Sequence, residues 1–193
     1  MYRQGIKAGA VLLALVGVVA LAAPAGAAKF RDLGKPARHV GAGESCGGCN
    51  AFQMETAPAT PSYVVPNGDW KIISWKAGGL KQGRSKARLR IYRPTGVSDQ
   101  YEIVKESGIE RFRAGQITEH RIRMRVKPGD HLGIVGIGDF VSSYDGRTGD
   151  TIGQPGGCIF PTIGDTVGGA GADCTNNTIG SARVNVGVTL KRR

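Results

Sequence analysis

The chain has 193 residues and a formal net charge of +11. This length suits one domain with a hydrophobic core, and the charge favours anionic partners without specifying a fold. The 31 glycines leave little room for long helices, because glycine destabilises helix interiors.

Residues 1–27 carry the pattern of a secretory signal peptide. Arg3 and Lys7 precede an apolar run that ends near Ala23, and small residues up to Ala27 resemble a signal peptidase site. We therefore expect export with cleavage after Ala27, and a secreted or cell-surface location. An uncleaved membrane anchor is the alternative, although the run is short for a span. No second apolar run follows, so we expect no transmembrane span after cleavage.

Residues 28–49 are rich in glycine and charge and show no sustained hydrophobic period. This composition predicts a flexible N-terminal segment. His39 lies in it and is expected to be solvated.

Residues 50–193 alternate short runs of β-branched and aromatic residues with turn signals such as Pro66-Asn67-Gly68 and Pro128-Gly129-Asp130. Such spacing predicts an all-β domain, an antiparallel β-sandwich. A glycine-rich tract over residues 146–171 is expected to form turns and loops. The expected strands are residues 51–56, 62–65, 70–77, 86–92, 100–106, 116–126, 131–137 and 182–190, with a shorter pair near Phe140 and Ile159.

Cations alternate with apolar residues on two of the expected strands. If those strands share a sheet, the cations lie on one solvent face, where guanidinium groups can bind phosphate, sulfate or carboxylate. A solvated face neutralised by Glu102, Glu106, Glu110 and Glu119 is the alternative. The polyanion-binding candidates are Lys86, Arg88, Arg90, Arg111, Arg113, Arg121, Arg123 and Arg125.

The four cysteines predict two disulfides in an exported protein. We favour Cys158 with Cys174, which would clamp the glycine-rich loop, and Cys46 with Cys49. A redox dithiol and a zinc site are the alternatives for Cys46 and Cys49, but no helix is expected after Cys49, and the spacing of Cys158 and Cys174 supplies no second metal half-site.

No catalytic or cofactor motif occurs, so we expect no enzyme activity. Asp130 and His131 are adjacent on an expected strand and would point to opposite faces, which disfavours a catalytic dyad. Loop carboxylates are ligands that Ca²⁺ takes, but their spacing fits no EF-hand pattern and ordinary turn formation is the favoured explanation. These weak metal candidates are Asp139, Asp145 and Asp150.

The segments YVVPNGDWKIISW, RLRIYRPTG, VKPGDHLGIVGIG, GCIFPTIGDTVGG and ARVNVGVTL follow one another along residues 50–193. This succession resembles uncharacterised secreted β-sandwich domains of the actinobacterial type, which are jelly-roll-like. The resemblance implies a fold and a location but assigns no catalytic residue.

These patterns together predict a secreted, non-catalytic extracellular structural or binding module that contacts an anionic cell-wall polymer or acidic polysaccharide. Specific nucleic-acid binding is not expected, because stacking aromatics are sparse. One alternative is a carbohydrate-binding sandwich with an aromatic platform, in a Ca²⁺-dependent or Ca²⁺-independent form. The other is a secreted hydrolase with an unrecognised site. The platform candidates are Trp70, Trp75, Tyr92, Tyr101 and Tyr144.

Overall fold

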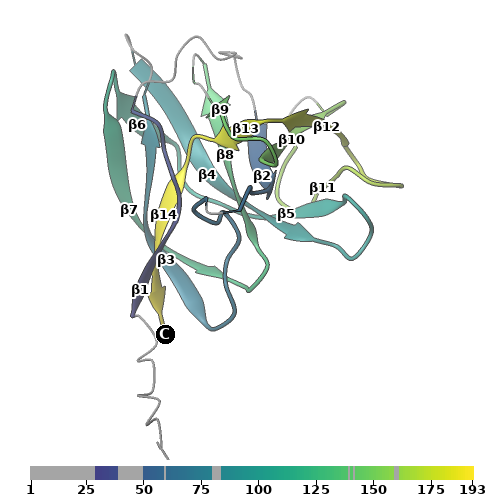
Figure 1. The fold of residues 1–193 in the computed structure, drawn as a ribbon, viewed down its shortest axis with the longest axis horizontal. Coiled ribbons are helices and arrows are strands. Elements are labelled where there is room, and N and C mark those ends of the chain that lie inside the picture. The colour runs from purple at the N-terminus through teal and green to yellow at the C-terminus, as the bar shows by residue number, and fades with distance from the viewer. Residues whose placement is uncertain are drawn as a thin grey trace, which may run out of the picture.

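In a computed structural model, the described residues are 29–38, 50–58, 60–79, 84–138, 140, 142–158 and 161–193. Every element in these ranges is a β-strand, and the strands pair antiparallel (Figure 1), so the predicted all-β antiparallel sandwich is confirmed. Within these ranges, no helix has the length and apolar character needed to cross a bilayer. The predicted signal peptide lies outside the described residues.

A four-stranded sheet forms one layer of the sandwich. Its order places both chain ends of the described domain side by side, with the last strand between the first and third strands. In sheet order it contains β1 (Phe30–Gly34), β14 (Gly187–Arg192), β3 (Trp70–Gly78) and β7 (Ile117–Val126).

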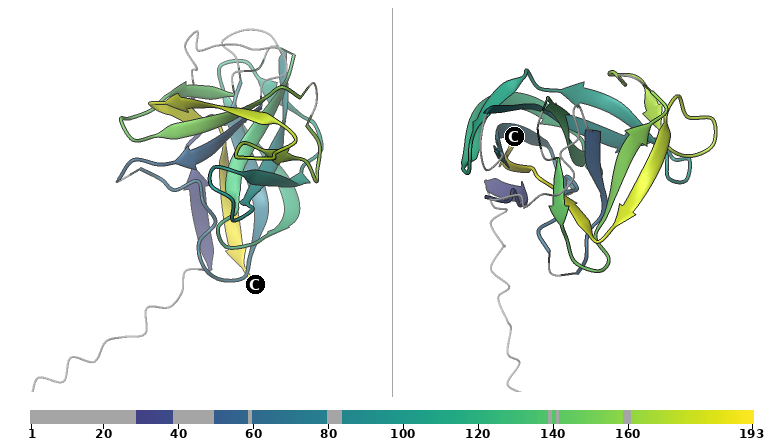
Figure 2. Two further views of the ribbon diagram at one scale, coloured as in Figure 1. Left: turned by 90° about the vertical axis from the view of Figure 1, so that its right-hand side faces the viewer. Right: turned by 90° about the horizontal axis from the view of Figure 1, so that it is seen from above.

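The second sheet is eight-stranded and curves round the core (Figure 2), with a small two-stranded sheet beside it. Its order is β11 (Thr166–Val167), β5 (Tyr101–Glu106), β4 (Arg84–Pro94), β8 (His131–Ile137), β2 (Asn50–Glu55), β10 (Thr151–Gly156) and β12 (Thr175–Gly180), and β6 (Glu110–Arg113) also pairs with β4. The small sheet pairs β9 (Ser143–Asp145) with β13 (Ala182–Val184).

The main core lies between the two large sheets. Trp75 of β3 is fully buried and meets Phe112 of β6 edge to face, with ring centroids 5.2 Å apart. Leu89 and Ile134 from β4 and β8 belong to the same buried cluster. Since apolar residues of both sheets fill one cluster, neither sheet can bury its inner face alone.

A second, smaller core covers part of the other face of the eight-stranded sheet. Phe52 stacks on Tyr92 with ring centroids 4.2 Å apart, and Ile103 and Val167 complete the cluster. A Cβ at Gly133 would lie 2.5 Å from the Tyr92 ring, so this position of β8 requires glycine. The loop that carries β11 contributes Val167 and Cys174 to this smaller core.

The prediction of a flexible segment over residues 28–49 was wrong for its described part. Residues 30–34 form β1, which pairs with β14, and Leu33 is only 1% exposed opposite Val188. Five residues with two charges show no clear period, so only the partner strand reveals this strand. Residues 39–49, with His39, Cys46 and Cys49, lie outside the described residues.

Other strand boundaries differ from the prediction for topological reasons. The expected strand over residues 62–65 is reduced to one bridge between Val64 and His131. The expected strand over residues 182–190 breaks after Val184, because β13 and β14 belong to different sheets. The glycine-rich tract contains β10, which was expected to be loop. Phe140 is buried but lies in no strand, and Ile159 lies outside the described residues.

The predicted disulfide between Cys158 and Cys174 is confirmed, with an S–S distance of 2.04 Å. It closes the loop that contains β11 and holds it against the smaller core.

Candidate functional site

The cations of β7 lie as the alternation predicts. Arg121, Arg123 and Arg125 are exposed, whereas Met124 and Val126 between and beyond them are buried. The strand is the last one of the four-stranded sheet, so its arginines stand on the outer face and along a free edge of that sheet.

The register of the sheet extends this basic surface across two more strands. Arg125 lies opposite Lys71 of β3, and Lys71 lies opposite Lys191 of β14. Lys191 in turn covers the ring of Phe30 at 5.7 Å. Neither lysine was among the candidates predicted from the sequence. Lys71 stands at an outward position of an expected strand, and Lys191 directly follows the expected strand that ends at residue 190.

We call Lys71, Arg121, Arg123, Arg125 and Lys191 the arginine face. Among the described residues, none of the five lies within salt-bridge distance of a carboxylate. Two acids stand beside this face: Glu119 lines the same groove and lies opposite Lys76, and Asp32 accepts a hydrogen bond from Thr189. A groove of about 840 Å³ runs over this face, and Ile73 forms part of its floor. Four cations of the arginine face line this groove, against one carboxylate.

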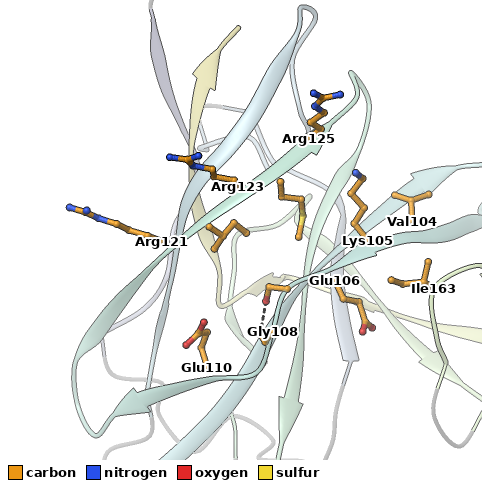
Figure 3. A pocket seen from close by; sticks show the side chains of 12 residues that line it. Val104, Lys105, Glu106, Gly108, Glu110, Arg121, Arg123, Arg125 and Ile163 are labelled. Carbon is orange, nitrogen blue, oxygen red and sulfur yellow. Dashed lines mark hydrogen bonds between the residues drawn. The ribbon is translucent and has the colours of Figure 1, made fainter.

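A second groove of about 690 Å³ lies on the other side of β7, between its free edge and β5. Figure 3 shows Arg121, Arg123 and Arg125 in succession along β7, with Lys105 rising from β5. Two carboxylates also line this groove, but both have partners. Glu106 binds Arg88 at 2.8 Å and also Arg90, and Glu110 lies 3.1 Å from Nδ1 of His120.

The cations of β4 do not join this surface, contrary to the expectation of a single basic face. β4 belongs to the eight-stranded sheet and β7 to the four-stranded sheet. Arg88 is paired with Glu106, and Arg90 is only 3% exposed because it binds Glu106 and the carbonyl oxygen of Pro161. Strand alternation gives the side of a sheet but does not show which loop covers that side.

The remaining candidates form a separate, smaller basic patch on the eight-stranded sheet. Lys86 is exposed and lies opposite Arg111 of β6, and Arg113 is also exposed. This patch has fewer aligned cations than the arginine face and lies on a different sheet.

Asp130 and His131 do not form a dyad. Both oxygens of the buried Asp130 bind Arg93, at 2.7 and 3.0 Å, and the backbone N–H of Lys127 donates to it as well. Nδ1 of His131 bonds the carbonyl oxygen of Gln53 at 2.7 Å. Burial lowers the pKa of His131 below its usual value, against the opposing effects of Gln53 and Asp130, so the ring is neutral and structural near pH 7.

The structure uses Asp150 to hold a turn. Asp150 is fully buried, binds Arg183 at 2.7 Å, and accepts the backbone N–H groups of Arg147 and Ala57. Asp145 is exposed on β9, and Asp139 lies outside the described residues. In the described ranges, no three His, Cys, Asp or Glu residues gather as a metal site would require.

The expected aromatic platform does not form. Trp70, Trp75 and Tyr92 are buried, and Tyr101 packs edge to face on Phe52. Tyr144 is partly buried and donates a hydrogen bond to the carbonyl oxygen of Lys35. These rings serve the cores and their margins rather than a carbohydrate surface.

Comparisons with protein-family models, with curated proteins and with solved structures found no match. The arginine face and its two grooves therefore carry the functional argument by themselves.

Proposed function

We propose that the protein is a secreted, non-catalytic module that binds an anionic polymer through the arginine face. One observation carries this proposal: the face holds a row of like charges directly opposite one another, and no described carboxylate lies within salt-bridge distance of them. Like charges at opposed positions destabilise a sheet, so this arrangement lowers the stability of the fold. A bound polyanion would relieve the repulsion.

The chemistry of the face suits sulfate, carboxylate or phosphate groups repeated along a chain. Its three arginines are spaced every second residue along one strand, so they recur at about 6.6 Å, twice the rise per strand residue. Guanidinium groups bind such oxyanions with paired hydrogen bonds, while Lys71 and Lys191 add unpaired charge beside them. An extended polymer could therefore contact the grooves on both sides of β7.

The alternatives of carbohydrate binding and hydrolysis have less support. The platform aromatics are largely buried, and the two carboxylates that line the β7 groove are engaged by Arg88, Arg90 and His120. Free cations, rather than free acids or rings, dominate the accessible surface around β7.

Elution from immobilised heparin and polygalacturonate tests the proposal. We expect the protein to elute above physiological salt, and the R121E/R123E/R125E variant to elute at much lower salt, because each phosphate-like contact contributes to salt dependence. The matched control is K86E/R111E/R113E, which changes the net charge equally on the other sheet. Equal losses in both variants would show that net charge alone drives retention and would refute a site on β7.

The single variant R125E separates binding from folding. It places a carboxylate opposite Lys71, so we expect the free energy of unfolding to rise by roughly 0.2–1 kcal/mol while heparin retention falls. Urea unfolding and column elution measure the two effects. Unchanged retention would contradict the proposed site, and a loss of stability would contradict the claim that Lys71 and Arg125 repel each other.

A further inference from the structure

A separate pocket of about 600 Å³ lies on the outer face of the eight-stranded sheet, away from the arginine face. Val135 and Ile137 of β8 line it from the sheet, and Ile109 and Pro161 line it from two loops. Its polar lining comes from Asn50, Arg88, Arg90, Glu106 and Thr162. Pockets of this size with apolar walls and a few polar groups are typical small-molecule sites.

The register brings the polar groups together at one end of the pocket. Asn50 of β2 and Arg88 of β4 both lie opposite Val135, so the three side chains form one row across three strands. Arg90 lies two residues further along β4, opposite Glu106 of β5. Two guanidinium groups thus share a single carboxylate, and the described lining keeps an excess of one positive charge.

Several polar atoms of this lining are buried and have no hydrogen-bond partner. They are Oδ1 of Asn50, Nε of Arg88, and Nε and Nη1 of Arg90. The Arg90 side chain is only 4% exposed, its Nη2 donates to Glu106 and to the carbonyl oxygen of Pro161, and the hydroxyl of Tyr92 also interacts with this guanidinium. Buried donors without acceptors are rare in folded proteins and call for an explanation.

We propose that this pocket binds a small monocarboxylate with an apolar body. The carboxylate supplies further acceptor oxygens and a second negative charge beside Glu106 for Arg88 and Arg90, and the body covers Val135, Ile137 and Ile109. A hydroxyl or amide N–H in the ligand would satisfy Oδ1 of Asn50. The pocket lies on the other sheet and uses none of the residues of the arginine face, although Glu106 also lines the groove beside β7.

Titration of ¹⁵N-labelled protein with 3-phenylpropanoate, with 3-phenylpropanamide as the uncharged control, tests this proposal. We expect amide shifts centred on residues 135–137, and binding of the carboxylate at least about tenfold tighter than that of the amide. No shifts at millimolar carboxylate, or equal affinity for the amide, would overturn the proposal.

Two variants locate the site without removing the buried Arg90. R88Q removes a charge whose side chain is 31% exposed, and I109D places a like charge on an apolar wall that is 51% exposed. We expect each to weaken binding about tenfold or more, whereas the control I117D, at an exposed isoleucine of β7, leaves it unchanged. If R88Q and I109D bind the carboxylate as tightly as the wild type does, the proposed pocket is refuted. R121E/R123E/R125E should bind the carboxylate normally, so failure of polymer binding and failure of this site remain distinguishable.

Discussion

Arginines at similar positions on strands differ in their exposure, and the residues that surround each one determine the difference. Arg125 and Arg90 both alternate with apolar residues on a strand, yet Arg125 is exposed while Arg90 is buried against Glu106 and Pro161. Arg183 is likewise buried. It lies on β13 between the apolar residues Ala182 and Val184, and it binds Asp150. Buried charges of this kind are retained only with partners, and the partners come from distant segments.

The pair of Asp150 and Arg183 leads to a pH-dependent prediction. Burial alone would raise the pKa of Asp150, but hydrogen bonds from Arg147, Ala57 and Arg183 lower the pKa below its usual value. A lowered folded-state pKa means that the ionised carboxylate stabilises the fold above the unfolded pKa of about 3.9. This stability is lost as the pH falls through the folded-state pKa.

We therefore expect D150N to lower the free energy of unfolding by about 3 kcal/mol at pH 7, because Arg183 loses its buried counter-charge. The difference in the free energy of unfolding between D150N and the wild type should be smaller near pH 3 than at pH 7. Urea unfolding at both pH values measures it, and D145N on the exposed end of β9 is the control. A constant difference across this pH range would contradict the role of the ionised carboxylate.

At the scale of elements, β1 is the clearest addition of the tertiary structure. It covers the edge of β14 with five paired residues, and Gly34 N–H donates to the carbonyl oxygen of Ser62 at 2.8 Å. β14 would otherwise be an unpaired edge, which is the kind of strand that promotes aggregation. Residues 30–34, which precede the predicted domain, therefore belong to the fold.

We expect L33A to lower the free energy of unfolding by about 2–4 kcal/mol, since Leu33 is buried in the main core. F30A in the same strand serves as the control, because Phe30 is 50% exposed and should contribute less than about 1 kcal/mol. Chemical denaturation of both variants measures the difference. If L33A destabilises the protein as little as F30A does, β1 does not pack against the core in solution.

The basic strands show how far element-level reasoning reaches. The alternation over residues 116–126 correctly predicts both the strand and the outward direction of its arginines, because strand geometry is local. It could not predict that β4 and β7 would part into different sheets, since that depends on which strands pair across the whole chain. The candidate surface accordingly lost the β4 cations and gained Lys71 and Lys191.

At the scale of the whole molecule, one core joins both sheets. The main cluster takes Trp75, Ile72 and Leu190 from the four-stranded sheet and Leu89 and Ile134 from the eight-stranded sheet. Exposure of either inner face would leave the other uncovered, so the sheets should lose structure together.

We expect a single unfolding transition in urea. Fluorescence of Trp70 and Trp75 reports on β3, and NMR signals of β8 amides report on the other sheet. Coincident midpoints would agree with one shared core. Separate midpoints would show that the two sheets are independent units.

The all-β class, most of the longer strands, the pairing of Cys158 with Cys174, and the outward arginines of β7 could be predicted from the amino-acid pattern. These features follow from composition, from the spacing of the cysteines, from the two-residue period of a strand, and from turn residues. The pairing of β1, the burial of Arg90, and the row of Lys191, Lys71 and Arg125 became visible in the folded chain alone. Strand pairing and loop coverage join residues far apart in the chain, so no local pattern contains them.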